Sequence, residues 1–557
     1  MKKIKTIFNI LDKNYIIYLF LILVSIIFIS IIEIIGIGSI PLLFSSILNT
    51  INPAEGNISN TIISKIFFLN SLDNFELIFI LSLIIFFAFI LKNLMLGSLF
   101  YAQGKMLKKL RVYFSKRVYN YYIENNPSII LTENSSKLVR TITHDIGNFT
   151  LHLIFILNLI RDFLILFFLS ILLLISNFKI SSFIFISLST VSFIIFFINK
   201  NKLFLRGKEI QKTSAIIIQK INETIGLLKE IKIYKLETYH AKKFLDNVEK
   251  IESYNFKNYF IQMLPRLILE VTVIFILVTI IILNLKDNMS IFELLPYLSL
   301  LIITSIRLIP AVNGITTSFN TLKITKASFQ LISNLLLNEA NFKKTNLRIK
   351  KVKFDKKLIL ENIYFKYPNQ KKYLFEDLNF QISKGERIGI IGTSGSGKTS
   401  LVNILIGLLN PQNGKVIIDN IVHNKYILEN VGYIPQEVFL TDDTIKNNIL
   451  CGEIENFDQN LFDKCVKLAE LDEIVKSLPN TVDTMIGERG LNISVGQKQR
   501  IGIARALYKR PSILIFDEST SALDNKTEEN FLNNIFSIDR SITLIFISHR
   551  RGPLLKC

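Results

Sequence analysis

The stretch "RIGIIGTSGSGKTSLVNILIGLL", residues 387–409, has the order expected of a strand, a glycine-rich loop and a helix. The loop fits the pattern GxxxxGK[ST] with Gly392, Gly397, Lys398 and Thr399. Glycines let backbone N–H groups wrap around a phosphate, and the following helix points its positive end toward it. In this pattern the lysine reaches the β- and γ-phosphates and the Thr399 hydroxyl binds magnesium. We expect an α/β domain that holds ATP and Mg²⁺ with Gly392, Thr393, Ser394, Gly395, Ser396, Gly397, Lys398, Thr399 and Ser400.

A second segment, "PSILIFDEST" (511–520), predicts a buried strand that ends in two acids. Asp517 would hold the magnesium ion, largely through water, and Glu518 would position or deprotonate an attacking water molecule. Acids at a strand end also occur as plain helix caps, but the phosphate-binding loop upstream favours the catalytic interpretation. The two segments together predict an ATP hydrolase.

The apolar residues of the chain are distributed unevenly. The chain has 557 residues, of which 50% are hydrophobic. Long runs of Ile, Leu and Phe fill residues 1–325, whereas residues 351–557 have the composition of an ordinary α/β domain. This break predicts a multi-domain membrane protein: a transmembrane domain over 1–325, a linker over 326–350 and a soluble domain over 351–557.

Six stretches are long and apolar enough for membrane-spanning helices, which need about 20 residues. They cover residues 16–38, 76–99, 151–176, 181–199, 264–285 and 291–312. The first follows three lysines but is too long for a signal peptide and lacks a clear cleavage site, so we expect it to remain as a span. The connections 100–150 and 200–263 are long enough to form helices that project well beyond the membrane.

Lysine and arginine gather on one side of the predicted membrane. With six spans, the connections 100–150 and 200–263 share one side and 39–75 lies on the other. The first side carries Lys105, Lys108, Lys109, Arg111, Lys116, Arg117, Lys200, Lys202, Arg206, Lys208 and Lys212. By the positive-inside rule this side is cytoplasmic. The net charge of +20 therefore has a topological explanation, and we expect a multi-pass protein of the cytoplasmic (inner) membrane with membrane lipid, not nucleic acid, as its partner.

Charged residues also occur inside the predicted spans, where they are costly and usually face a cavity or a partner. The cations are Lys92, Arg161, Arg266 and Arg307, and the acids are Glu33, Asp162, Glu270 and Glu293. Two interpretations remain open. The charges pair with one another or reach the interface, or the cations line a cavity for an anion such as a phosphate, which the planar fork of arginine binds well.

Further motifs, in order, resemble those of the ATP-binding cassette (ABC) exporters, in which membrane and nucleotide domains are fused. The segments are "FKYP" (365–368), "YIPQE" (433–437), "TMIGERG" (484–490), "SALD" (521–524) and "FISHR" (546–550). The resemblance implies that Tyr367 stacks on adenine and that Gln436 senses magnesium and the membrane helices. It also implies that Asp524 belongs to the D-loop and that His549 contacts the γ-phosphate. The expected catalytic residues are thus Glu518, His549 and Gln436, and the expected magnesium ligands are Thr399, Gln436 and Asp517.

The segment "ISVGQ" (493–497) departs from the LSGGQ signature of this family. In the family, Ser494, Gly496 and Gln497 would close over a nucleotide bound by a second subunit, so a homodimer of half-transporters is expected. Val495 replaces a glycine, which is costly only if the backbone requires a positive φ. Because Glu518 and His549 are kept, a working ATPase is favoured over a degenerate one. Only "RGPLLKC" follows "SHR", which the resemblance implies is a truncated end of the cassette.

Three segments of the membrane half, "IIEIIGIGSIPLL" (31–43), "LPRLILE" (264–270) and "IRLIPAVNGITTSFNTL" (306–322), resemble the flippase of lipid-linked oligosaccharides in bacterial protein N-glycosylation. The resemblance implies that Arg266 and Arg307 line a cavity for a lipid-linked saccharide. Gly314 stands where that family tends to have a further arginine. Two alternatives remain open: an exporter of drugs, peptides or other lipids, and a catalytically weak regulatory partner subunit.

Overall fold

The computed structural model describes residues 11–51, 74–124, 134–176, 178–286, 291–344, 350–367, 370–393, 395–423, 426–453, 455, 457–487, 490, 493–520, 525–548, 554 and 557. The chain divides into two compact units. Unit 1 comprises Met1–Ile123 and Glu133–Asn341, and unit 2 comprises Glu124–Thr132 and Phe342–Cys557. Each unit has its own hydrophobic cores.

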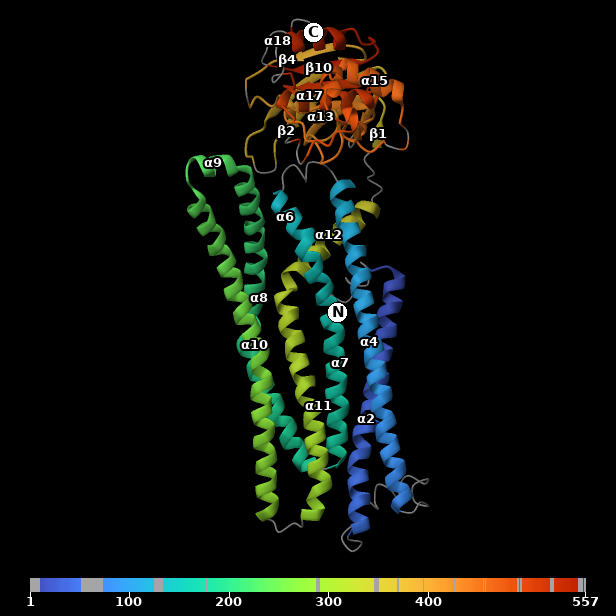
Figure 1. Ribbon diagram of the computed structural model, residues 1–557, viewed down its shortest axis with the longest axis vertical. Coiled ribbons are helices and arrows are strands. Elements are labelled where there is room, and N and C mark those ends of the chain that lie inside the picture. Colours follow the sequence, from blue (N-terminus) through green and yellow to red (C-terminus); the bar gives the residue numbers. More distant parts are fainter. Residues whose placement is uncertain are drawn as a thin grey trace. The chain divides into compact units, whose positions relative to one another are not determined.

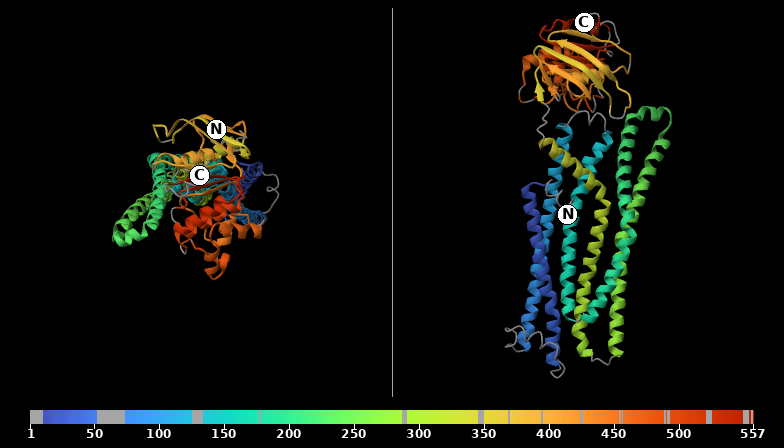
Figure 2. Two further views of the ribbon diagram at one scale, coloured as in Figure 1. Left: turned by 90° about the horizontal axis from the view of Figure 1, so that it is seen from above. Right: turned by 180° about the vertical axis from the view of Figure 1, so that it is seen from behind.

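Unit 1 is helical, and its long helices lie side by side (Figures 1 and 2). Its elements are α2 (Lys13–Ile51), α4 (Asn74–Glu124), α6 (Ser135–Arg140), the π-helical turn η1 (Thr141–Asp145), α7 (Ile146–Ser176), α8 (Phe178–Gly226), α9 (Leu228–Ile233), α10 (Glu237–Lys286), α11 (Ile291–Ile324) and α12 (Lys326–Lys344). Helix α4 has 51 residues, so at 1.5 Å per residue it is about 75 Å long. This is more than twice the ~30 Å hydrocarbon core of a bilayer, so α4 extends well beyond the membrane.

Four stretches of the described helices are long and apolar enough to cross a membrane: Lys13–Phe44, Phe75–Glu124, Ser135–Leu174 and Glu237–Thr279. Their outward faces expose large apolar side chains such as Phe20, Phe86 and Phe275, which suits contact with lipid. The predicted spans 181–199 and 291–312 lie in α8 and α11, and most of their side chains lie outside the described part of the chain. Unit 1 is therefore a multi-pass membrane domain.

Residues 326–344, which the sequence suggests as part of a linker, form helix α12. Phe329, Ile332 and Leu336 of this helix are buried in a core that also contains residues of α2, α4 and α7. The ring of Phe329 stacks on Phe149 of α7, with the two centroids 5.3 Å apart. Helix α12 is thus packed into unit 1.

The described residues of unit 2 form three sheets. Its strands are β1 (Lys350–Val352), β2 (Lys357–Phe365), β3 (Phe375–Ser383), β4 (Arg387–Ile390), β5 (Asn413–Ile418), β6 (Ile421–His423), β7 (Tyr426–Leu428), β8 (Val431–Ile434), β9 (Ile513–Asp517) and β10 (Thr543–Ile547). The parallel sheet has the order β4-β10-β9-β8, the antiparallel sheet has the order β3-β2-β5-β6, and β1 pairs with β7. The helices are α13 (Lys398–Leu405), α14 (Ile445–Leu450), α15 (Gln459–Leu468), α16 (Asp472–Ser477), the short 3-10 helix η2 (Thr481–Asp483), α17 (Val495–Tyr508) and α18 (Asn525–Phe536).

The parallel sheet determines where the functional segments meet. Every residue of β9 and β10 is buried, which explains their unbroken apolar sequences. Strand β4 ends just before the phosphate-binding loop, β8 ends two residues before Gln436, and β9 ends at Asp517. In an open α/β sheet ligands bind at the carboxyl ends of the strands, so this edge is the expected ligand site.

Candidate functional site

The glycines of the phosphate-binding loop have backbone conformations that other residues rarely adopt. Gly395 has φ of 82° and Gly397 has φ of 95°, both in the left-handed region. A Cβ on Gly397 would also lie 2.9 Å from Cζ of Phe375. Helix α13 begins directly after this glycine, so the loop delivers the helix N-terminus to the edge of the sheet.

Lys398 lies over the loop that precedes it. Its Nζ donates to the carbonyl oxygens of Gly392, at 2.8 Å, and Thr393, at 3.0 Å. Phosphate oxygens are charged acceptors and form stronger bonds with an ammonium group than carbonyls do. The lysine is therefore positioned to exchange these carbonyls for nucleotide phosphates.

Two hydroxyl groups meet at one oxygen of Asp517. The Thr399 hydroxyl donates to Asp517 Oδ2 at 3.0 Å, and the Tyr433 hydroxyl donates to the same atom, also at 3.0 Å. Hydroxyl and carboxylate oxygens are hard ligands of the kind that Mg²⁺ prefers. Within the described residues no group of three or more His, Cys, Asp or Glu side chains could hold a metal by itself, so a magnesium ion here would also draw on phosphate oxygens.

Tyr433 was not among the residues predicted from sequence. Burial, and then the negative charge and hydrogen bond of Asp517, raise the pKa of its hydroxyl well above the usual value, so it remains a donor at physiological pH. Its position near Asp517 results from the pairing of strands: β8 and β9 are parallel neighbours, with Tyr433 opposite Ile515. Only the sheet order reveals that this tyrosine reaches the end of β9.

Glu518 follows β9 directly and contacts Gln436. The Gln436 Nε2 group donates to Glu518 Oε2 at 2.9 Å. The Glu518 backbone has φ of 50° and its N–H donates to Ile547 O at 2.9 Å. A left-handed conformation in a residue other than glycine costs roughly 1–3 kcal/mol and often marks a functional position. The carboxylate is thus held at the strand end, next in sequence to Asp517.

Tyr367 is brought to the start of α13. Its hydroxyl lies 2.9 Å from Oγ of Ser400, and its ring packs edge-on against Phe365 at 5.1 Å. The ring is therefore fixed next to the phosphate-binding helix, where a nucleotide base would need an aromatic neighbour. Stacking on adenine stays a prediction.

The signature segment caps helix α17. Ser494 is the N-cap residue, and it exchanges two hydrogen bonds with Gln497 in a capping box. Val495 is the first helical residue, it is exposed, and it has no positive φ. The Cβ of Val495 therefore causes no backbone strain, and the helix N-terminus with Gly496 remains accessible. Three residues predicted for the site, Ser394, Asp524 and His549, lie outside the described residues.

The intramembrane cations fall into separate groups. Lys92 of α4 donates to Glu33 Oε1 of α2 at 2.7 Å, and Nε of Arg307 in α11 lies 3.6 Å from the same oxygen. Lys92 and Glu33 are buried. Both cations also lie 5.7 Å from the ring centroid of Phe89. The structure thus brings Lys92 and Arg307 together around one carboxylate, which leaves one positive charge in excess.

Arg161 and Arg266 each pair with an acid of their own helix. Arg161 contacts Asp162 at 2.8 Å in α7, and Arg266 contacts Glu270 at 2.8 Å in α10, where both side chains are exposed. Asp162 Oδ2 is buried without a hydrogen-bond partner, and a Cβ on Gly314 would lie 2.1 Å from it. Any side chain at position 314 would therefore displace the Asp162 carboxylate.

The fold and this site define an ATP-binding cassette joined to a membrane-spanning helical domain. Residues 375–521 match the family model described as ABC transporter. The whole chain matches the solved structure of a bacterial Atm1-family ABC exporter with ATP bound, with a TM-score of 0.73 and 17% identity over 97% of this chain and 92% of that one. Residues 375–521 thus match the ABC transporter family, and the chain has the fold of an ABC exporter, which confirms the predicted fold class and the predicted resemblance to ABC exporters.

Curated relatives carry several transport functions in their names. The chain is 28% identical over 360 residues to the ATP-dependent lipid A-core flippase of Pseudomonas aeruginosa, covering 63% of this chain and 58% of that protein. It is 26% identical to the flippase of the same name in Burkholderia pseudomallei, covering 82% and 76%. It is 37% identical over 199 residues to a mitochondrial iron-sulfur clusters transporter of Danio rerio, covering 35% of this chain and 26% of that protein. The match thus spans from about a quarter to three-quarters of the length of these three proteins.

The exporter relatives and the apolar helices agree with the predicted multi-pass membrane location, with the nucleotide-binding domain in the cytoplasm.

Proposed function

We propose that this protein is one half of an ATP-driven transporter that flips a lipid-linked oligosaccharide, or a related lipid with a polar headgroup, across the cytoplasmic membrane. One observation supports the proposed ATPase activity above all. Thr399 and Tyr433 both donate to Asp517, and Gln436 donates to the adjacent Glu518. These residues lie in or just after two strands, β8 and β9, and in the phosphate-binding helix α13. They supply a metal site and a base at the carboxyl edge of one parallel sheet.

The chemistry assigns a role to each group. Lys398 and the loop N–H groups bind the β- and γ-phosphates, and Mg²⁺, when bound by Thr399 and Asp517, neutralises charge that develops on the phosphate oxygens. Glu518 accepts a proton from water as the water oxygen bonds to the γ-phosphorus. The bond from that phosphorus to the bridging oxygen breaks, and ADP leaves with this oxygen. Gln436 holds the Glu518 carboxylate in position through its amide N–H.

A complete nucleotide site needs a second subunit. One chain carries one phosphate-binding loop and one capped signature helix, and in the resembling family these face each other across two chains. The hydrogen bonds of Ser494 and Gln497 are used locally in the cap. The unstrained Val495 supports a competent signature helix over the catalytically weak alternative. We therefore propose a homodimer.

The cargo proposal rests on charge and on the names of relatives. A phosphate-bearing headgroup cannot cross hydrocarbon unaided, because burying charge without a partner is costly. The excess positive charge around Glu33, from Lys92 and Arg307, offers such a partner within unit 1. Two of the relatives are named ATP-dependent lipid A-core flippases. The pairing of each intramembrane cation with a carboxylate favours the second candidate, an exporter of drugs, peptides or other lipids.

Cargo-stimulated ATP hydrolysis in reconstituted vesicles separates the candidates. We expect the wild-type protein to hydrolyse Mg-ATP and to be stimulated by a lipid-linked saccharide. Arg307→Gln should remove the stimulation but keep basal hydrolysis, because the Lys92–Glu33 pair remains. Glu518→Gln should lower hydrolysis by roughly a hundredfold or more, the scale of losing a catalytic base.

The matched control is Lys232→Gln, which removes an exposed lysine paired with Glu237 at 3.2 Å outside the membrane. It should change neither basal hydrolysis nor its stimulation by the lipid-linked saccharide. Equal stimulation of the wild-type and Arg307→Gln proteins would contradict the proposal of a charged cargo. Absence of hydrolysis in the wild-type protein would contradict the proposed ATPase activity.

A further inference from the structure

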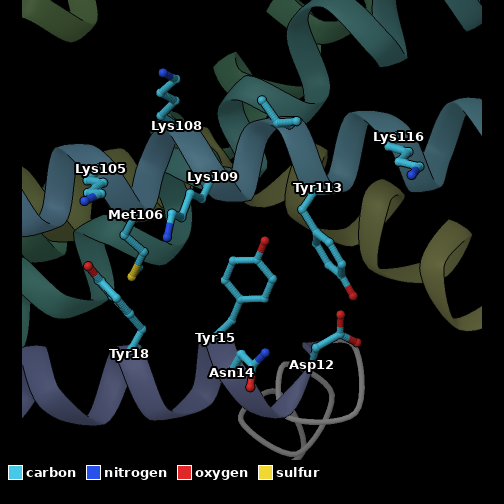
Figure 3. Close-up of a pocket in the computed structure, with 11 residues that line it drawn as sticks. Asp12, Asn14, Tyr15, Tyr18, Lys105, Met106, Lys108, Lys109, Tyr113 and Lys116 are labelled. Atoms are coloured by element: carbon cyan, nitrogen blue, oxygen red, sulfur yellow. The ribbon is translucent and has the colours of Figure 1, made fainter.

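A basic cavity lies between α2 and α4, where both helices leave the apolar part of the membrane domain on the cytoplasmic side. Its volume is 710 Å³. Four lysines of α4 line it, Lys105, Lys108, Lys109 and Lys116, together with Tyr15 and Tyr18 of α2 (Figure 3). None of these residues belongs to the nucleotide site or to the charge cluster at Glu33.

The charge of this cavity is uncompensated. Asp12 is the single acid among the described residues that line it, so four lysines and one carboxylate give this lining an excess of three positive charges. Asp12 lies beside the Tyr113 hydroxyl (Figure 3). Within the described ranges of unit 1, no ion pair joins any of the four lysines to a carboxylate. The positive-inside rule explains why lysines lie on this side, but it does not explain why they surround a cavity.

The walls of the cavity are aromatic. The Lys109 ammonium lies 5.5 Å from the ring centroid of Tyr18, and the Tyr15 and Tyr113 centroids are 4.9 Å apart. Lys109 extends from α4 toward Tyr15 and Tyr18, whereas Lys108 points away from α2 (Figure 3). Met106, 1% exposed, closes the inner side. The cavity thus combines ammonium and phenol donors with an apolar lining.

The same two helices offer apolar surface on the membrane side of the cavity. Ile17 and Phe20 of α2 and Leu94 and Phe100 of α4 are exposed. Tyrosines commonly lie at the level of lipid headgroups, between the apolar and the aqueous zone. A ligand that contacts all of these groups needs an anionic head and an apolar tail.

We propose that this cavity binds the phosphate headgroup of an anionic phospholipid of the cytoplasmic leaflet. Lys105 and Lys109 are its principal cationic contacts, and Tyr15 and Tyr18 contribute hydroxyl donors. Basic pockets between membrane helices on the cytoplasmic side are suited to such headgroups. The bound lipid would join α2 to α4 at the surface of the membrane domain. This proposal depends on the membrane location and not on the transported cargo.

The test uses the full-length protein in vesicles of phosphatidylcholine with a minor share of phosphatidylglycerol. After gentle extraction in detergent, the phospholipid that stays bound is measured by mass spectrometry. We expect the wild-type protein to be enriched in phosphatidylglycerol, and Lys105→Gln with Lys109→Gln to lose this enrichment by roughly tenfold, since each surface lysine contributes to anionic lipid binding. Lys105→Arg with Lys109→Arg should keep it, which shows that the loss reflects charge and not misfolding.

Lys243→Gln is the matched control, because Lys243 also lies over a tyrosine ring, 4.4 Å from the centroid of Tyr239 in α10, but lines no part of this cavity. It should retain the enrichment. The proposal is overturned if the wild-type protein shows no enrichment, or if the double glutamine variant retains it. It is also overturned if soluble glycerol phosphate displaces the lipid, since the site would then recognise free phosphate compounds.

Discussion

At the scale of single residues, Asp517 and Glu518 show how neighbours in sequence acquire different partners. Asp517 ends a fully buried strand and receives two hydroxyl donors at one oxygen. Glu518 turns into the left-handed region and meets Gln436. The change in backbone direction between them gives the two carboxylates different partners: Asp517 meets Thr399 and Tyr433, and Glu518 meets Gln436.

Tyr433→Phe tests whether the second hydroxyl positions Asp517. Loss of a hydrogen bond to a carboxylate costs about 1.5–3 kcal/mol, so the variant should need about tenfold more Mg²⁺, or a still higher concentration, for half-maximal ATP hydrolysis. ATP binding without magnesium should be unchanged, because Lys398 and the loop are intact. Titration of Mg²⁺ in the hydrolysis assay measures the effect.

Tyr373→Phe serves as the control, since the Tyr373 ring packs edge-on against Tyr364, with centroids 5.8 Å apart, and lies 5.0 Å from the Lys366 ammonium. Its magnesium dependence should equal that of the wild-type protein. A Tyr433→Phe variant with the same magnesium dependence would show that Thr399 alone positions Asp517.

At the scale of elements, the wide turn η1 organises the cytoplasmic part of unit 1. The π-helical turn brings residues five apart onto one side, so Arg140 Nε donates to Asp145 Oδ2 at 3.0 Å. The other oxygen of Asp145 accepts from Gln211 of α8 at 2.8 Å and from Ser328 of α12 at 2.7 Å. One buried carboxylate thus joins three helical segments.

Asp145→Asn should lower the thermal unfolding temperature of the detergent-solubilised protein. The substitution leaves the buried Arg140 guanidinium without a counter-charge, and breaking a buried pair in this way costs about 3–5 kcal/mol. Replacing both partners, Arg140→Met with Asp145→Leu, should recover part of the loss because no unpaired charge remains.

Glu209→Gln is the comparison for this prediction, since Glu209 pairs with Lys250 at 2.9 Å on the exposed surface. Exposed pairs contribute little, so its unfolding temperature should not change measurably. An equally small change in unfolding temperature for Asp145→Asn would mean that the ion pair of Arg140 and Asp145 does not stabilise the protein.

At the scale of the whole molecule, the chain pairs one cassette with one membrane domain. If two phosphate-binding loops close on two signature helices, Mg-ATP should drive two chains together whenever hydrolysis is blocked. Glu518→Gln, which keeps every nucleotide contact, should therefore accumulate as a pair in light scattering when Mg-ATP is added. Lys398→Ala should not form this ATP-dependent pair, because it removes a phosphate contact. A single-chain mass for Glu518→Gln with Mg-ATP would contradict the sandwiched arrangement.

The sequence by itself determined the class of this protein. A phosphate-binding loop presents N–H groups from consecutive residues. The short segment 392–399 is therefore enough to predict the phosphate site. A membrane span is likewise a property of one continuous stretch. This is why each of the four helical stretches found among the described residues overlaps a predicted span. The capped start of α17 at Val495 also follows from the adjacent Ser494 and Gln497.

Only the tertiary structure decided which distant groups meet. Lys92, Glu33 and Arg307 lie on three helices, and their meeting depends on how each helix is rotated about its axis, which hydropathy does not encode. Tyr433 reaches Asp517 because β8 and β9 are neighbours, although 84 residues separate them. Helix α12 has low overall apolarity and suggested a linker, but Phe329, Ile332 and Leu336 fall on one face and are buried by other helices. The physical reason is the same in each case. Local interactions involve residues that are adjacent in sequence, so the sequence predicts them directly. These contacts join residues far apart in sequence and form only when the chain has folded.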